Sequence, residues 1–157
     1  MKRGYTKTYL KIFIVILILI AIILGVIYLF RNEYDNERFE TIKTNMLLIE
    51  AKTKIVSEKV NIKEKDAKYI GTKVSDIKDS EGLTFLQDRG LIDLNSKEHI
   101  YYVLNKDNLV ELGLDTIELK KGFYIIDYKT NEIIYTEGVT NKNGDTLYKL
   151  SDMENME

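Results

Sequence analysis

Residues 12–30 read IFIVILILIAIILGVIYLF, a run of 19 residues without a charged side chain or a proline. At a rise of 1.5 Å per residue, a helix of this length spans roughly 29 Å, close to the hydrocarbon thickness of a bilayer. A core helix of a soluble protein carries a polar stripe, whereas this run is apolar on every side. The run therefore predicts a membrane-spanning helix.

A secretory signal peptide is the alternative, because it also combines a basic start with an apolar segment. The run exceeds the length of about 7–15 residues that is usual for a signal core, and residues 31–35 (RNEYD) offer no small-residue cleavage site. We therefore expect the segment to stay in the membrane as a single-pass anchor.

The charges that precede the run predict its orientation. Four basic residues and no acidic residue stand before it: Lys2, Arg3, Lys7 and Lys11. Basic residues remain on the cytoplasmic side of a membrane span. We expect residues 1–11 in the cytoplasm and the C-terminal domain outside the cell membrane.

Composition limits what that domain can do. Five of the 23 basic residues and none of the 25 acidic residues lie in the first 31 positions, so the rest of the chain has a formal charge of −7. An acidic domain lacks the basic footprint that nucleic acid requires. The chain has no cysteine, which excludes disulfides, thiol nucleophiles and cysteine metal sites.

The helix is expected to continue beyond the bilayer, because residues 31–70 contain neither glycine nor proline. Apolar or small residues recur there in alternating steps of three and four, which is the spacing of one helical face. They are Phe39, Ile42, Met46, Ile49, Thr53, Val56 and Val60, and Leu48, Ile55 and Ile62 are expected to widen the stripe. We predict a rod from about residue 10 to residue 62.

This stripe has two interpretations. It packs against the chain's own C-terminal domain, or it forms an intermolecular coiled coil over residues 39–60. A coiled coil prefers Leu, Ile or Val at its seam, whereas Phe39, Met46 and Thr53 differ in bulk. The pattern favours packing under a sheet by Phe39, Ile42, Met46, Ile49, Val56 and Val60.

The C-terminal part alternates strand and turn signals. Short helices are expected from Ser80 to Arg89 and after Asn105, and β-branched and aromatic residues predict strands at 100–104, 123–128, 132–136 and 145–150. Lys129-Thr130-Asn131 predicts a three-residue hairpin loop, and Asn143-Gly144 predicts a second hairpin. We expect an α+β fold in which the long N-terminal helix packs on a small antiparallel sheet.

The chain is thus expected to comprise five parts. These are a cytoplasmic basic N-terminus (1–11), a transmembrane helix (12–30), its extracytoplasmic continuation (31–62), a small α+β ectodomain (63–150) and an acidic tail (151–157).

Catalytic signals are weak. His99 is the single histidine and is expected at the surface beside Glu98, and no serine lies in a Gly-x-Ser-x-Gly elbow. Asn141 to Asp145 presents oxygens at alternating positions but lacks the acidic start and closing Glu of a calcium loop, so a hairpin explains it better. We expect no catalytic residue, metal, cofactor or small-molecule substrate.

Several segments resemble type IV pilins and type II secretion pseudopilins, over roughly residues 39–150. The similar segments are MLLIEAKTK (46–54), YIGTKVSD (69–76), YYVL (101–104), and GFYIIDY (122–128) with EII (132–134). The resemblance implies a transmembrane helix that runs into an amphipathic half with a small antiparallel sheet laid on it. It also implies a structural or accessory subunit of a secretion or pilus-type machine, with other pilin-like subunits or secretion-machine proteins as partners and no enzymatic activity.

The N-terminus departs from the pilin pattern. Gly4 and Tyr5 resemble a degenerate prepilin processing site, but Lys7, Thr8 and Tyr9 stand where pilins have an aliphatic pair and a glutamate. The resemblance therefore implies an uncleaved anchored protein or a minor subunit that caps or primes a filament. The alternative is a bitopic scaffold of the cell-division or envelope type that self-associates through residues 39–60.

Overall fold

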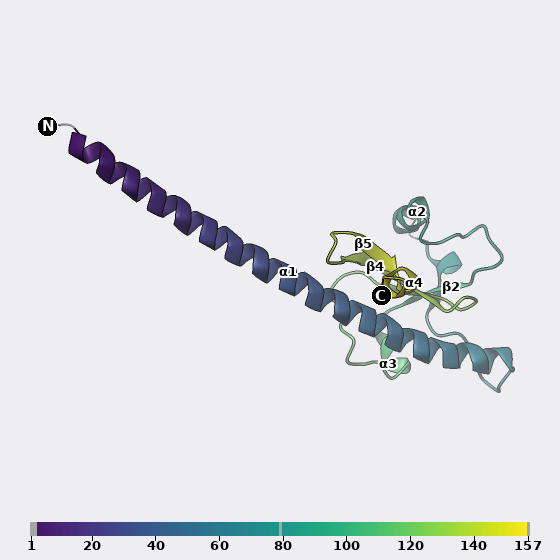
Figure 1. The fold of residues 1–157 in the computed structure, drawn as a ribbon. Coiled ribbons are helices and arrows are strands. Elements are labelled where there is room, and N and C mark those ends of the chain that lie inside the picture. The colour runs from purple at the N-terminus through teal and green to yellow at the C-terminus, as the bar shows by residue number, and fades with distance from the viewer. Residues whose placement is uncertain (1–2, 79, 157) are drawn as a thin grey trace. The chain divides into compact units, whose positions relative to one another are not determined.

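The computed structural model describes the backbone of residues 3–78 and 80–156 (Figure 1). Its elements are, in chain order, α1 (Arg3–Asn61), β1 (Thr72–Lys73), the 3-10 helix η1 (Val74–Asp76), α2 (Ser80–Asp88), β2 (Tyr101–Leu104), α3 (Lys106–Glu111), β3 (Tyr124–Asp127), β4 (Glu132–Thr140), β5 (Thr146–Lys149) and α4 (Leu150–Glu154). This is an α+β fold with a long N-terminal helix and a small antiparallel sheet, as the sequence predicts.

The chain divides into two compact units between Glu37 and Arg38. In the first unit, the apolar side chains of residues 13–30 on α1 are exposed. The second unit contains the remainder of α1 together with the sheet and the short helices. Residues of α1 after Glu37 and the residues of the sheet therefore belong to one folded unit, in which Met46 and Ile49 share a core with the strands.

The sheet is an antiparallel meander in the order β1-β2-β3-β4-β5. Ile126 of β3 pairs with Tyr102 of β2 and with Ile133 of β4. The β3–β4 turn comprises four residues rather than the predicted three, since Asp127 pairs with Glu132. Asn131 takes the left-handed conformation at a φ of 59°, and its amide donates to the Asp127 carbonyl over 2.8 Å.

Both faces of the sheet are covered. Successive side chains of a strand point to opposite faces, and Tyr124 and Ile126 face the core that contains α1, whereas Ile125 faces a second cluster under α2. The second cluster contains Val74, Leu86, Leu91, Ile92, Tyr101, Ile125 and Ile134. This double coverage explains why residues 123–128 read as a continuous apolar run instead of an alternating one.

Besides the burial of Leu86 in the second cluster, two cations join the α2 segment to the sheet. The guanidinium of Arg89 lies 4.4 Å from the ring centre of Phe85 and 5.4 Å from that of Tyr148, and it donates to the Tyr148 hydroxyl. Lys149 adds a hydrogen bond to the Gly90 carbonyl at 3.3 Å. Contacts of a cation with an aromatic face are modestly stabilising at exposed sites, so they fasten α2 to β5.

The short helix α3 has the ends that its sequence predicts. The side chain of Asn105 accepts from the Asn108 amide, and the side chain of Asn108 accepts from the Asn105 amide, which makes a capping box. Gly113 ends the helix at a φ of 74°, a conformation that costs glycine little, and the next amide, of Leu114, bonds back to Leu109. These two caps place Leu109 in the core beside α1.

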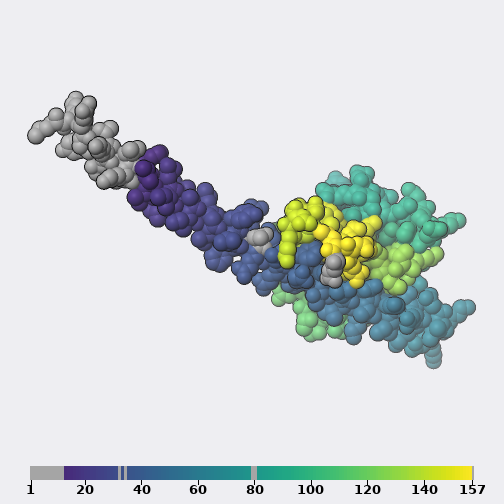
Figure 2. Space-filling model, viewed as in Figure 1, coloured from purple at the N-terminus to yellow at the C-terminus, as the bar shows by residue number. Residues whose placement is uncertain are grey.

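The C-terminus differs from the prediction. The strand expected at 145–150 ends at Lys149, and α4 follows it where an acidic tail is expected. Leu150 and Met153 are buried in the core that contains α1, and Met153 is only 1% exposed. Figure 2 shows this C-terminal segment lying against α1 in the second unit. The three-residue spacing of Leu150 and Met153 is typical of one helical face, but the acidic charge of residues 151–157 led to the prediction of a tail.

Candidate functional site on helix α1

The face of α1 that meets the sheet is built from the residues that the stripe indicates. Met46 and Ile49 have 0% exposed surface and share a core cluster with Ile126 and Ile133 of the sheet. Three more stripe residues, Phe39, Ile42 and Val56, are half-buried and pack against that cluster. Val60 is half-buried near the C-terminal end of α1.

Polar side chains on this face are satisfied inside the fold. The hydroxyl of Thr53 donates to the Ile49 carbonyl at 2.8 Å, and that of Ser57 donates to the Tyr128 carbonyl at 3.2 Å. Both side chains are buried, and each bond offsets the cost of removing a hydroxyl from water. Ser57 was not predicted to lie on this face, although its four-residue spacing from Thr53 is a signal for it.

Tyr128 joins α1, the sheet and the segment before β1. Its hydroxyl donates to the Ile70 carbonyl at 2.9 Å and accepts from the Ile70 amide at 3.1 Å. Its ring stacks on Tyr69 at 4.3 Å between ring centres and meets Tyr102 edge-on at 5.3 Å. Burial raises the pKa of Tyr128 to about 12, although the backbone hydrogen bond of Ile70 lowers it. Packing therefore accounts for these tyrosines.

Tyr124 is the second buried tyrosine beside α1. The amide of Asn45 lies 3.5 Å from its hydroxyl, which connects α1 to β3. Burial raises the pKa of Tyr124 to about 12, and the Asn45 hydrogen bond only partly offsets this effect. Its ring lies 5.1 Å from that of Tyr135. The neutral phenol is thus the form that this interior accommodates.

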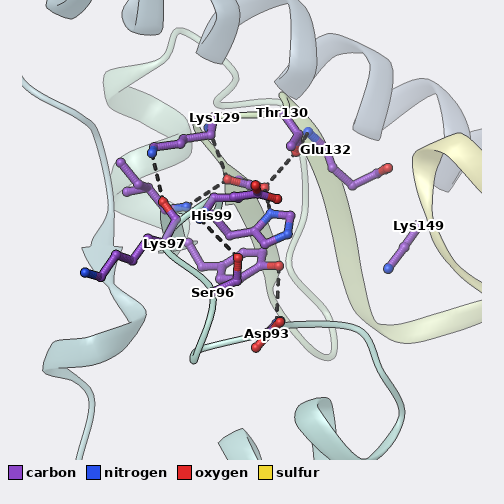
Figure 3. Close-up of polar contacts among 12 residues, drawn as sticks. Asp93, Ser96, Lys97, His99, Lys129, Thr130, Glu132 and Lys149 are labelled. Carbon is purple, nitrogen blue, oxygen red and sulfur yellow. Dashed lines mark hydrogen bonds and ion pairs between the residues drawn. The ribbon is translucent and has the colours of Figure 1, made fainter.

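Asp127, at the end of β3, is the centre of a polar network that includes His99, Lys129 and Thr130, which Figure 3 labels. It is 1% exposed, and its carboxylate accepts from the amides of Ile100 at 2.9 Å and Lys129 at 3.1 Å. The Thr130 hydroxyl donates to it at 2.7 Å, and Nδ1 of His99 lies 2.6 Å from it. Burial alone raises the pKa of Asp127, but these hydrogen bonds outweigh burial and hold the pKa below its ordinary value of 3.8.

His99 is not the surface residue that the sequence suggests. Its side chain is 30% exposed, contacts Asp127 and stacks on Tyr101 with ring centres 5.3 Å apart. A His–Asp pair is also two-thirds of a hydrolytic triad, but the hydroxyl beside it, that of Thr130, bonds to the carboxylate and not to the imidazole. The geometry therefore serves to fasten the β3–β4 turn to the segment before β2.

The Asn141–Asp145 loop uses its oxygens internally. Oδ1 of Asn141 accepts from the amides of Asn143 and Asp145, each at 2.9 Å, and its Nδ2 donates to the Asp145 carboxylate at 3.2 Å. Gly144 has a φ of 88°, as the predicted Asn-Gly turn requires. Across the described residues, no group of three or more His, Asp or Glu side chains could hold a metal ion.

One shallow groove of about 270 Å³ lies beside this loop. Its walls come from α1, the β4–β5 loop and the C-terminal segment: Phe39, Glu40, Lys43, Asn141, Lys142, Asn143, Met153 and Met156. Its lining mixes two lysines, one glutamate and two amides without a buried unpartnered polar side chain aimed into it. The groove does not define a ligand.

The opposite face of α1 corrects one further prediction. Leu48, Ile55 and Ile62 do not widen the packing stripe, because they are 44%, 51% and 74% exposed. At 100° per residue, these three point away from Met46 and Ile49, and the sheet covers only one side of the helix. Part of the apolar pattern on α1 is thus unused by the chain's own fold.

The predicted membrane anchor, residues 12–30, lies in the first unit. Among the residues that the structure describes, α1 is the one helix long and apolar enough to cross a membrane, and the fold buries none of its apolar window. Gly4 and Tyr5 lie within the first turns of α1. A single apolar N-terminal helix is compatible with a membrane anchor.

Helix α1 thus carries an exposed apolar run, a face that forms part of the core and a face that the sheet leaves uncovered. Comparisons with protein-family models, with curated proteins and with solved structures found no match.

Proposed function

We propose that this chain is a membrane-anchored, pilin-like structural or accessory subunit of a type II secretion or type IV pilus-type machine. The proposal rests on the two different roles that α1 has along its length. The same helix contains the apolar run at 12–30 and, from Arg38 onward, the residues on which an antiparallel meander packs. The resemblance of residues 39–150 to pilin-like proteins adds the class of machine.

The anchor explains why the first unit exposes so much apolar surface. Exposed apolar patches on a soluble monomer rarely exceed a few hundred Å² and otherwise mark contact with a membrane or a partner. Side chains of residues 13–30 are exposed around the whole helix, which suits lipid better than one protein partner. The basic residues before the run support an orientation with the N-terminus in the cytoplasm and the sheet outside.

The self-associating scaffold is less well supported. A coiled coil through residues 39–60 would need the stripe of Met46, Ile49 and Thr53, and those side chains are buried within the chain's own second unit. Using them would require that unit to open. Subunit contacts through other faces of α1 need no such opening.

Reporter fusions test the anchor and its direction. Alkaline phosphatase fused after Glu157 should be active, and the same enzyme fused before Met1 should be inactive. Ile20→Arg should reduce membrane integration, because a central arginine costs about 2.5–3.5 kcal/mol on insertion scales, whereas Ile55→Arg is the matched control outside the run. Activity of the Met1 fusion would overturn the orientation.

Co-purification tests the machine. The tagged full chain, extracted from native membranes in mild detergent, should carry along pilin-like or secretion-machine subunits. Its absence from every such complex would contradict the assignment. Intact-mass measurement of the same sample reports whether the chain is cleaved after Gly4 or retains Met1, which distinguishes a processed subunit from a permanent tether.

A further inference from the structure

The uncovered face of α1 has the spacing of a helix-binding seam. Leu48 and Ile55 of α1 are seven residues apart and exposed, and Ile62, which follows the last residue of α1, continues this spacing and is exposed as well. Ala51 and Glu58 lie between them and are also exposed. The steps are three, four, three and four, which is the a and d pattern of paired helices. The packed face of the same helix is used by the sheet, so the two faces have separate roles.

Charges border this seam in a definite arrangement. Lys52 and Lys59 lie on one flank and Lys54 on the other, at the positions that meet the neighbouring helix in a coiled coil, and all three are exposed. Lys59 lies 3.8 Å from Glu64, and neither Lys52 nor Lys54 has an ion pair among the described residues. Lys52 and Lys54 are therefore the lysines that are better placed to pair with a carboxylate of a partner. The seam is therefore apolar with basic flanks and one carboxylate, Glu58, within it.

A second copy of this chain fits the seam poorly. Two copies anchored in one membrane by the same apolar run lie parallel, a condition that rests on the proposed function. In a parallel pair in register, Glu58 faces Glu58 within the seam and Lys54 faces Lys59 across it. Repulsion between like charges at these positions disfavours pairing of two identical helices and thereby favours a different partner.

We infer that the face formed by Leu48, Ala51 and Ile55 of α1, together with Ile62 in the turn directly after it, binds an amphipathic helix of a different protein, one with acidic flanks. Acidic side chains of that helix would meet Lys52 and Lys54, and a basic side chain would lie opposite Glu58. Charge complementarity of this kind determines specificity and the rate of encounter more than total affinity. Confinement to the same membrane raises the effective concentration of a weakly binding partner helix.

Two synthetic peptides test the inference directly on the full chain in phosphatidylcholine nanodiscs. Both peptides carry Leu and Ile at the a and d positions over about four heptads; one has Glu at every e and g position and the other has Lys. Fluorescence anisotropy should show the Glu peptide binding at least tenfold more tightly than the Lys peptide. Lys52→Glu combined with Lys54→Glu should invert that preference.

Substitutions locate the binding to the seam. Leu48→Asp and Ile55→Asp should abolish binding of the Glu peptide, whereas Val110→Asp on α3, which replaces a side chain that is 51% exposed, should leave binding unchanged. The fold should be retained in all three variants, because all three positions are exposed. Circular dichroism of each variant checks this. Equal binding of both peptides, no binding, or equal binding to empty nanodiscs would overturn the inference.

A cross-linking arm separates the partner from a second copy. Leu48→Cys creates the single cysteine of the chain, and oxidation in membranes should yield little disulfide dimer. Efficient dimer formation would contradict a heterologous partner. The peptide measurements do not depend on membrane orientation, so their failure is distinguishable from failure of the reporter fusions that test the proposed function.

Discussion

Nδ1 of His99 lies 2.6 Å from Oδ2 of Asp127, which joins the segment before β2 to the end of β3. Asp127→Ala should lower the free energy of unfolding by about 3 kcal/mol, because it leaves the buried donors of this site without their acceptor. Urea unfolding of the full chain in detergent, followed by near-UV circular dichroism, measures the change. Asp115→Ala, at an exposed position, is the control; equal stabilities of the two variants would contradict the structural role.

The lowered pKa of Asp127 predicts that the stability of the fold decreases at acidic pH. The pKa of Asp127 is lower in the folded protein than its ordinary value of 3.8, so the charged form is favoured by folding. Its contribution is complete above about pH 5 and decreases as pH falls through 3.8 toward the lower folded pKa. Asp127→Asn should show a smaller loss of stability over that range. Parallel curves for both proteins would count against this assignment.

Tyr128→Phe should cost about 1–2 kcal/mol, because it removes the partner of the Ile70 amide and carbonyl while keeping the ring. Tyr148→Phe is the matched control and should cost less, because its hydroxyl accepts a hydrogen bond from Arg89 that is exposed to solvent. Thermal unfolding of the two variants provides the comparison. A smaller loss for Tyr128→Phe than for Tyr148→Phe would contradict the role of the Ile70 contacts.

Alkaline pH tests burial of the same phenols. Burial raises the pKa of Tyr124 and of Tyr128 to about 12, so the neutral form is favoured by folding. Their contribution to stability is complete below pH 10 and is lost as pH rises from 10 through about 12. Absorbance at 295 nm should show at least two of the 11 tyrosines ionising late or only on unfolding, since burial also raises the pKa of Tyr101 and of Tyr102. Complete ionisation near pH 10 in the folded protein would be inconsistent with this placement.

The register of α1 is tested by two aspartates on opposite faces. Ile49→Asp should destabilise the second unit by about 4 kcal/mol or more, through lost burial and a buried charge. Ile55→Asp should change stability by no more than about 0.5 kcal/mol, since Ile55 is exposed. Denaturant midpoints of the two full-length variants decide the point; an unchanged midpoint for Ile49→Asp would refute the packing face.

Periodicity and local turn chemistry predicted much of this architecture. The steps from Phe39 to Val60 indicate which face of α1 is buried, because a helix repeats every 3.6 residues whatever it packs against. Asn105, Gly113 and Gly144 mark their turns through local chemistry that needs no tertiary contact. These features depend only on residues that are close in the sequence, so the sequence is sufficient to predict them.

What the sequence could not predict depends on partners distant in the chain. Leu48 and Ile55 are as apolar as Met46 and Ile49, and only the position of the sheet separates exposed from buried. Asp127 resembles an ordinary turn residue, since its four donors come from two segments that pairing of β2 with β3 brings together. Likewise, α4 is too short to be distinguished from a solvated tail until the core beside Met153 exists.

Labelling of single cysteines tests the central claim, that one helix serves as membrane anchor and as part of a folded core. The chain has no cysteine, so Ile20→Cys, Ile49→Cys and Val110→Cys each introduce a unique thiol. With a membrane-impermeant maleimide applied to the outside of intact cells, Val110→Cys on α3 should react, Ile49→Cys should be protected by the core, and Ile20→Cys should be protected by lipid although its side chain is exposed in the fold. Labelling at position 20, or equal labelling at positions 49 and 110, would contradict the account.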